Sequence, residues 1–138
     1  MIIKDIKIEK NIEINSTESF SAPNLKSAWH IWANSAKSFS VPKLEEAKCI
    51  YAPLAKSFSA PNLKEVYNIN AKSAKIFSIP KLKKVDGDIQ AKSAKTFSAP
   101  ELKESAWYIY TPSAKEIFVP KLETARIIYA ESAEIIEL

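Results

Sequence analysis

His30 and Cys49 are the only histidine and the only cysteine in the chain, and these two residue types can act together as base and nucleophile. They are 19 residues apart, a separation that the repeat described below turns into neighbouring positions. No aspartate or glutamate stands where it would orient the imidazole, so we do not expect a catalytic pair. One cysteine and one histidine also exclude a disulfide framework and the common zinc sites. We therefore expect no enzymatic activity, no metal and no cofactor.

The acidic residues give no catalytic site either. Asp86 and Asp88 flank Gly87, the only glycine among 138 residues, and this pattern favours a turn over a metal site. The glutamates are scattered along the chain and do not cluster as glycoside cleavage would require. The carboxylates therefore indicate turns and surface positions.

A row of lysines recurs at a spacing of 19 or 20 residues and consists of Lys37, Lys56, Lys75, Lys95 and Lys115. Glu18 and Glu134 bracket the row. The simpler interpretation is a solvated ridge that discourages sheets from pairing edge to edge. The alternative is a track for an anionic polymer, either nucleic acid or an acidic glycan. Because Arg126 is the only arginine among 20 basic residues, nucleic-acid binding would be weak, non-specific and salt-sensitive.

Every tryptophan and tyrosine falls in three neighbouring sets of repeated positions. From two of these sets we predict a binding face that contains His30, Trp32, Tyr51, Asn70, Gln90, Tyr108, Tyr110 and Tyr129. Aromatic side chains on a rigid surface are typical of binding hot spots, so the expected partner is another protein. The alternative is that the tyrosines only stabilise a sheet through cross-strand contacts. Trp29 and Trp107, in the third set, are more simply explained as covers for the edge of the core.

An internal repeat places all of these residues. The phrase SFSAPNLK at 19–26 recurs unchanged at 57–64 and with substitutions at 38–45, 76–83 and 96–103, and a looser copy stands at 116–123. The prolines of these blocks are spaced 19, 19, 19, 20 and 20 residues apart. These prolines are Pro23, Pro42, Pro61, Pro80, Pro100 and Pro120. A fixed period of this length is the signature of a solenoid, in which each coil packs on its neighbours.

Apolar residues recur within each coil at the spacing of a strand. Isoleucine and phenylalanine are each followed two residues later by another core residue, which is the period of a strand and not of a helix. The predicted core columns include Ile12, Ile31, Ile50, Ile69, Ile89, Ile109 and Ile128; Phe20, Phe39, Phe58, Phe77, Phe97, Ile117 and Ile136; Ala22, Val41, Ala60, Ile79, Ala99, Val119 and Leu138; and Ala28, Ala47, Val66, Val85, Ala106 and Ala125. The expected fold is all-β: a parallel β-solenoid of about seven coils of 19–20 residues, about 30 Å long, without regular helices.

The segment 81–91 reads KLKKVDGDIQA, in which Leu82, Val85, Gly87, Ile89 and Ala91 follow the spacing L-x-x-I-x-G-x-L-x-I. This unit resembles the leucine-rich repeats of receptor L domains and of bacterial surface (BspA-like) proteins. The resemblance implies leucine-rich-repeat-like coils, and it brings no catalytic residue with it. The chain departs from the pattern because this glycine occurs only once and alanines stand where common leucine-rich repeats have asparagine.

We predict one solenoid domain over 1–138, with an N-terminal capping coil at 1–18, five regular repeats at 19–115 and a looser C-terminal coil at 116–138. Met1, Ile3 and Ile6 fall in phase with later core positions, whereas Glu9 breaks the pattern, as in a capping repeat. The last coil shows no cap, which leaves two alternatives. Its glutamates deter end-to-end growth, or a partner covers it, and a second copy there would give a homo-oligomer through a solenoid end.

Hydrophobic residues make up 46% of the chain, which excludes a disordered protein. No apolar run is long enough to cross a membrane. Lys4, Asp5 and Lys7 interrupt the first isoleucines, so we expect no secretory signal there. The expected location is cytoplasmic, or surface or secreted if the chain is a fragment of a longer protein. A purely structural fragment of a larger repeat protein is then a third alternative, beside binding of a protein and binding of an anionic polymer.

Overall fold

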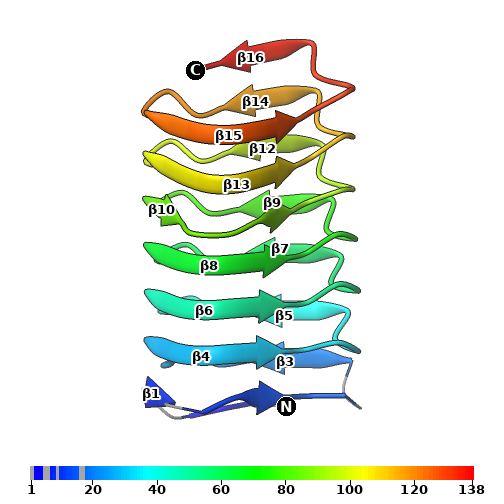
Figure 1. Ribbon diagram of the computed structural model, residues 1–138. Helices are drawn as coiled ribbons and strands as arrows, with labels where there is room; N and C mark the ends of the chain where they lie inside the picture. Colours follow the sequence, from blue (N-terminus) through cyan, green and yellow to red (C-terminus); the bar gives the residue numbers. More distant parts are fainter. Residues whose placement is uncertain (1, 5–6, 9, 16–17) are drawn as a thin grey trace.

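The chain forms a parallel β-solenoid of about seven turns in the computed structural model (Figure 1). The structure describes residues 2–4, 7–8, 10–15 and 18–138. This part of the chain contains no helix, and so none with the length and apolarity needed to cross a bilayer. The fold class predicted from the periodicity is confirmed.

Each coil adds strands to two facing walls, which we call the long wall and the short wall (Figure 1). The long wall contains β1 (Lys7–Ile8), β2 (Ile12–Glu13), β4 (Ser27–Trp32), β6 (Glu46–Tyr51), β8 (Glu65–Asn70), β10 (Lys84–Val85), β11 (Ile89–Gln90), β13 (Glu104–Tyr110) and β15 (Thr124–Tyr129). The short wall contains β3 (Ser19–Ser21), β5 (Ser38–Ser40), β7 (Ser57–Ser59), β9 (Ile76–Ser78), β12 (Thr96–Ser98), β14 (Glu116–Phe118) and β16 (Ile135–Glu137). The pairings between these strands are parallel.

Two tight turns close each regular coil, and proline fits the second position of both. The Leu44 N–H donates to the Val41 carbonyl oxygen at 3.2 Å, with Pro42 in the second position. At the other corner, the Ala55 N–H donates to the Ala52 carbonyl oxygen at 3.2 Å, with Pro53 in the second position of the turn. Type I turns prefer proline there. No described residue has a positive φ, so these turns do not need glycine.

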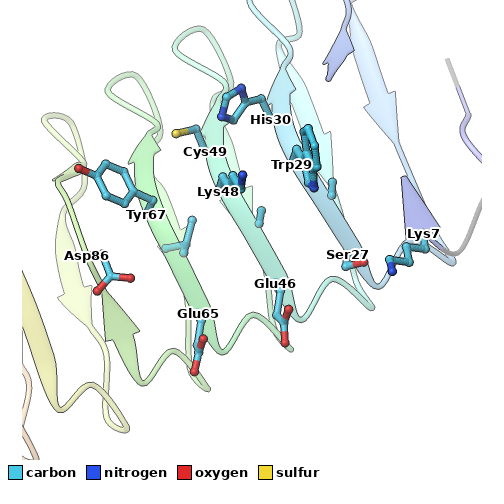
Figure 2. Close-up of a pocket in the computed structure, with 13 residues that line it drawn as sticks. Lys7, Ser27, Trp29, His30, Glu46, Lys48, Cys49, Glu65, Tyr67 and Asp86 are labelled. Atoms are coloured by element: carbon cyan, nitrogen blue, oxygen red, sulfur yellow. The ribbon is translucent and has the colours of Figure 1, made fainter. Parts of the chain in front are cut away.

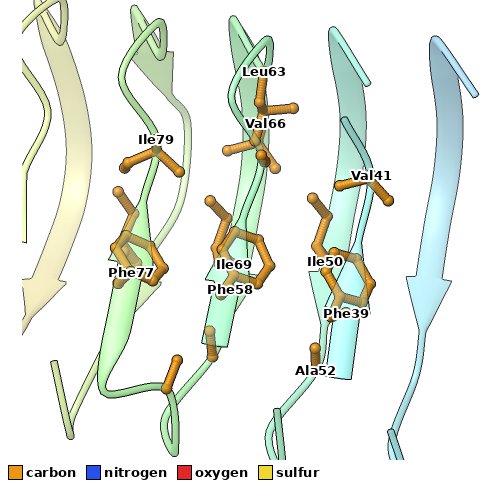
Figure 3. Packing of buried hydrophobic residues seen from close by; sticks show 14 of the residues in the cluster. Phe39, Val41, Ile50, Ala52, Phe58, Leu63, Val66, Ile69, Phe77 and Ile79 are labelled. Atoms are coloured by element: carbon orange, nitrogen blue, oxygen red, sulfur yellow. The ribbon is translucent and has the colours of Figure 1, made fainter. Parts of the chain in front are cut away.

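The core between the walls is built from stacked side chains of the same kind. Phenylalanine rings of neighbouring coils stack with their centroids 5.2 to 5.8 Å apart. Figure 3 shows Phe39, Phe58 and Phe77 at the same place in successive coils. Alanines such as Ala52 are fully buried, and their small size lets the two walls approach each other. The coils together therefore bury a core that no single coil could bury alone.

The long wall is irregular in the two coils that have 20 residues. Asp86, Gly87 and Asp88 separate β10 from β11. In the preceding coil only Tyr67 and Asn68 lie between the residues of β8 that pair with these two strands. A Cβ atom on Gly87 would lie 2.8 Å from the Tyr67 carbonyl oxygen and would overlap the Asn68 side chain. The segment is therefore a β-bulge pressed against the previous coil. The turn predicted from its two aspartates is wrong.

The bulge continues into β13, where one core prediction is also wrong. Val85 pairs with Ser105, and beyond the bulge Tyr108 pairs with Ile127. Because the extra residue shifts the register by one, Ser105 takes the buried position predicted for Ala106, and Ala106 is exposed. The Ser105 hydroxyl is buried without a hydrogen-bond partner.

The last coil is less buried than its apolar columns predict. Ile136 and Leu138 are 53% and 73% exposed, and Ala125 is also exposed. Ile128 is only half-buried, as are the apolar residues Leu122, Ala130 and Ala133, whereas Ile117 and Val119 at the start of this coil are buried. The physical reason is that no described strand pairs with the outer edge of β15 or β16.

At the other end of the solenoid, Ile12 is only 6% exposed, and Ile3 packs against the core in phase with later coils. The predictions for Met1, Ile6 and Glu9 lie outside the described residues.

Ser105→Ala should raise the free energy of unfolding by about 1–2 kcal/mol, because it removes a buried hydroxyl that has no partner. Alanine already fills the same column at Ala28 and Ala47. Denaturant unfolding followed by circular dichroism measures the change. Ser98→Ala, on an exposed position of β12, is the matched control and should change stability by less than about 0.5 kcal/mol. A clear loss of stability in Ser105→Ala would contradict the idea that this hydroxyl lacks a partner.

Candidate functional site

The eight residues of the predicted binding face lie on the outer side of the long wall, in two parallel rows. The first row crosses six coils in register and contains Trp32, Tyr51, Asn70, Gln90, Tyr110 and Tyr129. His30 and Tyr108 belong to the neighbouring row, in which His30 pairs with Cys49 and Tyr108 pairs with Ile127. The rows do not form one continuous site, because the surface is hollowed at two separate places along them.

One hollow lies near the C-terminal end of the long wall, and we call it the tyrosine trough. Its volume is about 440 Å³, and it is lined by Asp88, Gln90, Tyr108, Tyr110, Ile127 and Tyr129. These residues come from the bulge and from β11, β13 and β15, so the trough crosses three successive coils. Four of the predicted face residues meet here: Gln90, Tyr108, Tyr110 and Tyr129.

Local contacts fix the walls of the trough. The rings of Tyr110 and Tyr129 stack with their centroids 5.1 Å apart and their planes 15° apart. The Tyr129 hydroxyl donates a hydrogen bond to the Glu131 carboxylate, which raises the pKa of that tyrosine. On the opposite side, Asp88 Oδ1 accepts a hydrogen bond from the Tyr108 N–H at 3.1 Å. The tyrosines are therefore held by neighbours from the same wall.

The β-bulge gives the middle strand of the trough one more outward residue than β15. Ala106, Trp107 and Tyr108 are all exposed in β13, Trp107 at 44% and Tyr108 at 40%, whereas β15 has only Arg126 and Ile127 in the matching stretch. The Arg126 guanidinium lies 4.8 Å from the centre of the Trp107 ring and covers one of its faces. This leaves Tyr108 to line the trough. Asp88 and Ile127 also line it and were not predicted, although the repeat puts both in the same row as Tyr108.

A second hollow, of about 630 Å³, lies on the long wall nearer the N-terminus, and only His30 of the predicted face lines it. Figure 2 shows Trp29, His30, Lys48, Cys49 and Tyr67 on its surface, with Glu46 and Glu65 at the starts of β6 and β8. The Lys48 ammonium lies 4.5 Å from the centre of the Trp29 ring. An internal cation therefore already covers this tryptophan.

His30 and Cys49 occupy paired positions on β4 and β6, as the 19-residue spacing predicts. Burial raises the pKa of the Cys49 thiol, which favours the unreactive protonated form. The buried His30 Nδ1 atom has no hydrogen-bond partner among the described residues. No three His, Cys, Asp or Glu side chains of the described residues are grouped closely enough to hold a metal ion. The pair therefore has the residue types of a nucleophilic site without the activation that such a site needs.

The lysine row runs along the corner that follows the long strands. Its two ends are ion-paired: Lys37 Nζ lies 2.8 Å from Glu18, and Lys115 Nζ lies 3.2 Å from Glu134. The hydrogen bond with Lys37 lowers the pKa of Glu18, and the same bond raises the pKa of Lys37. The three lysines between them are exposed and form no ion pair with described residues, namely Lys56, Lys75 and Lys95. The unneutralised charge of the row is therefore concentrated at its middle.

The comparisons with known proteins do not extend this description, since no family model, no curated protein and no solved structure matches the chain. Any function must therefore be argued from the two hollows and the lysine row.

Cys49 should react slowly with a thiol-alkylating reagent at neutral pH, because burial raises its pKa and leaves little thiolate. The rate should keep rising with pH past the range in which an exposed cysteine levels off. Mass spectrometry of time points measures it. The control is the double variant Cys49→Ser, Ser98→Cys, whose cysteine is exposed on β12 and should react faster. Faster reaction of Cys49 at neutral pH would indicate an activated thiol.

Proposed function

We propose that this chain is a non-enzymatic binding scaffold whose partner is another protein, held on the outer face of the long wall. The observation that carries the proposal is the tyrosine trough, where three tyrosines and one isoleucine, each at least 36% exposed, meet over a rigid sheet. Clustered aromatic side chains that lose little conformational entropy on binding are typical of protein-binding surfaces. The unactivated state of Cys49 supports the absence of an enzymatic role.

The resemblance to leucine-rich repeats is part of this proposal. Its support is the unit at 82–91, in which all five pattern positions are buried: Leu82, Val85, Gly87, Ile89 and Ala91. Solenoids of stacked coils use their extended surfaces for binding. The long wall offers such a surface, and its outward positions vary from coil to coil while the isoleucine column beside them is constant.

Replacing Tyr108, Tyr110 and Tyr129 together with alanine should abolish capture of the protein partner, because truncation of interface aromatics removes most of the binding free energy. The partner is first identified by affinity capture from native lysate on the unchanged chain, and the variant is then tested against it. The matched control replaces three exposed apolar residues off this face with alanine, namely Leu54, Ile76 and Phe118. Circular dichroism checks that both variants fold. Normal capture by a folded aromatic variant would reject the proposal.

The second candidate function is weak binding of an anionic polymer, either nucleic acid or an acidic glycan, and the middle of the lysine row favours it. Lys56, Lys75 and Lys95 are one coil apart and exposed, so their charges add along the axis of the solenoid. The glutamates that pair with the row stand only at its ends. A polyanion lying along the corner would neutralise the three middle lysines.

Retention on immobilised heparin or DNA should be lost when Lys56, Lys75 and Lys95 are changed to glutamine. The loss reflects fewer released counterions, so retention of the unchanged chain should also fall steeply with salt. The control changes Lys43, Lys81 and Lys103 to glutamine, which gives the same net charge from exposed lysines outside the row. Equal loss in both variants would mean that net charge, and not the row, causes the retention.

A further inference from the structure

We infer that the tyrosine trough binds a proline-rich segment of the partner, in the polyproline II conformation, lying along the solenoid axis with a basic residue beside the prolines. The inference rests on the proposed function and names the chemistry of its partner.

The backbone of the sheet is not available to a partner over the trough. β13, the middle strand of the trough, pairs with β10 and β11 on one side and with β15 on the other. Its paired N–H and C=O groups serve these ladders, and the Tyr108 N–H donates to Asp88 Oδ1, so a partner cannot add a strand here. The partner must therefore be recognised through side chains alone.

The repeat distance along the trough matches a polyproline II helix. Equivalent positions in its first and third coils are two strand spacings apart, which is about 9.6 Å. A polyproline II helix advances about 9.3 Å for each turn of three residues. Two residues of an extended strand advance about 6.7 Å, and one turn of an α-helix advances about 5.4 Å. Neither distance equals the spacing of about 9.6 Å between the first and third coils of the trough. Prolines three residues apart would therefore meet equivalent places at the two ends of the trough.

The hydrogen-bonding groups of the trough suit a backbone that offers mainly acceptors. Polyproline II has no internal hydrogen bonds, and proline has no N–H, so the carbonyl oxygens of such a segment need donors. The Gln90 amide and the hydroxyls of Tyr108 and Tyr110 line the trough and can donate. The Tyr129 hydroxyl is already used by Glu131 and contributes its ring only.

The charge of the trough favours a bound segment that has a basic residue next to its prolines. Asp88 lines one end, Glu131 is hydrogen-bonded to Tyr129 at the other, and no lysine or arginine lines the trough. This local acidity contrasts with the net charge of +4 for the chain. At the other hollow, by contrast, Lys48 lies over the Trp29 ring, so the aromatic surface there is already partly covered.

The test titrates the chain with a short synthetic peptide that has a proline at every third position and one arginine beside the first proline. Two-dimensional NMR should show saturable shifts concentrated at the trough. A peptide with alanine in place of each proline should bind at least about tenfold more weakly, because it is not held in the polyproline II conformation. Equal binding of the two peptides, shifts that lie elsewhere, or no binding at all would overturn the inference.

Variants of the chain provide an independent readout. Tyr108→Ala should weaken binding of the proline peptide about tenfold or more, whereas Tyr67→Ala, an exposed tyrosine on the same wall outside the trough, should leave it unchanged. Asp88→Asn keeps the oxygen that accepts from the Tyr108 N–H and removes only the charge. It should weaken binding at low salt and have little effect at high salt. An unchanged affinity in Tyr108→Ala would place the peptide elsewhere and overturn the inference.

The two proposals fail in different ways. If the aromatic triple variant loses the captured partner but the proline peptide does not bind, only the inference about the proline-rich segment is wrong. If the triple variant captures its partner normally, the proposed function itself is wrong.

Discussion

The structure depends on one constraint: each residue must lie directly over its counterpart in the coil below, at the spacing of hydrogen-bonded parallel strands. In the core this stacks phenylalanine on phenylalanine and isoleucine on isoleucine, which buries identical shapes against each other. On the surface the same constraint stacks like charges, as for Glu46 over Glu65 and for the middle of the lysine row. Favourable core packing and unfavourable surface repulsion therefore have the same origin. The exposed side chains form rows, and a ligand is expected to follow a row along the axis.

The fold could be predicted from the sequence because its signal is repeated in every coil. Isoleucine and phenylalanine return every 19 or 20 residues, and the two-residue spacing beside them identifies strands. The same period placed the predicted aromatic residues on one wall, since positions that are one repeat apart must stack. The repeat period does not predict the shape of the surface. Two hollows lie along the predicted face, and the period alone does not locate them.

Ser105 and Ala106 illustrate where prediction failed. Both residues are small enough for the narrow core position, so composition does not distinguish the register with Ala106 inside from the register with Ser105 inside. In the coil before, the extra residue is marked by Gly87, which packs too closely against the Tyr67 carbonyl for any side chain. β13 has no such marker, because its extra residue points outward and meets no steric limit. The lining of the trough by Asp88 and Ile127, by contrast, follows from the repeat, which puts both residues in the row of Tyr108.

The extra residue of the bulge is confined to two coils. It enters the long wall after Val85, persists in β13 and is absent from β15, where the regular spacing of the paired residues resumes. The short wall is irregular at the same place. Its strand pairing is interrupted between β9 and β12, and the ring centroids of Phe77 and Phe97 on these strands are 5.8 Å apart, the largest such spacing in the phenylalanine stack. A single residue can therefore be inserted with only a local change in the buried columns, here Ser105 in the column that holds alanine or valine in earlier coils. Such an insertion adds one outward side chain, Ala106, while the isoleucine column beyond it keeps its register.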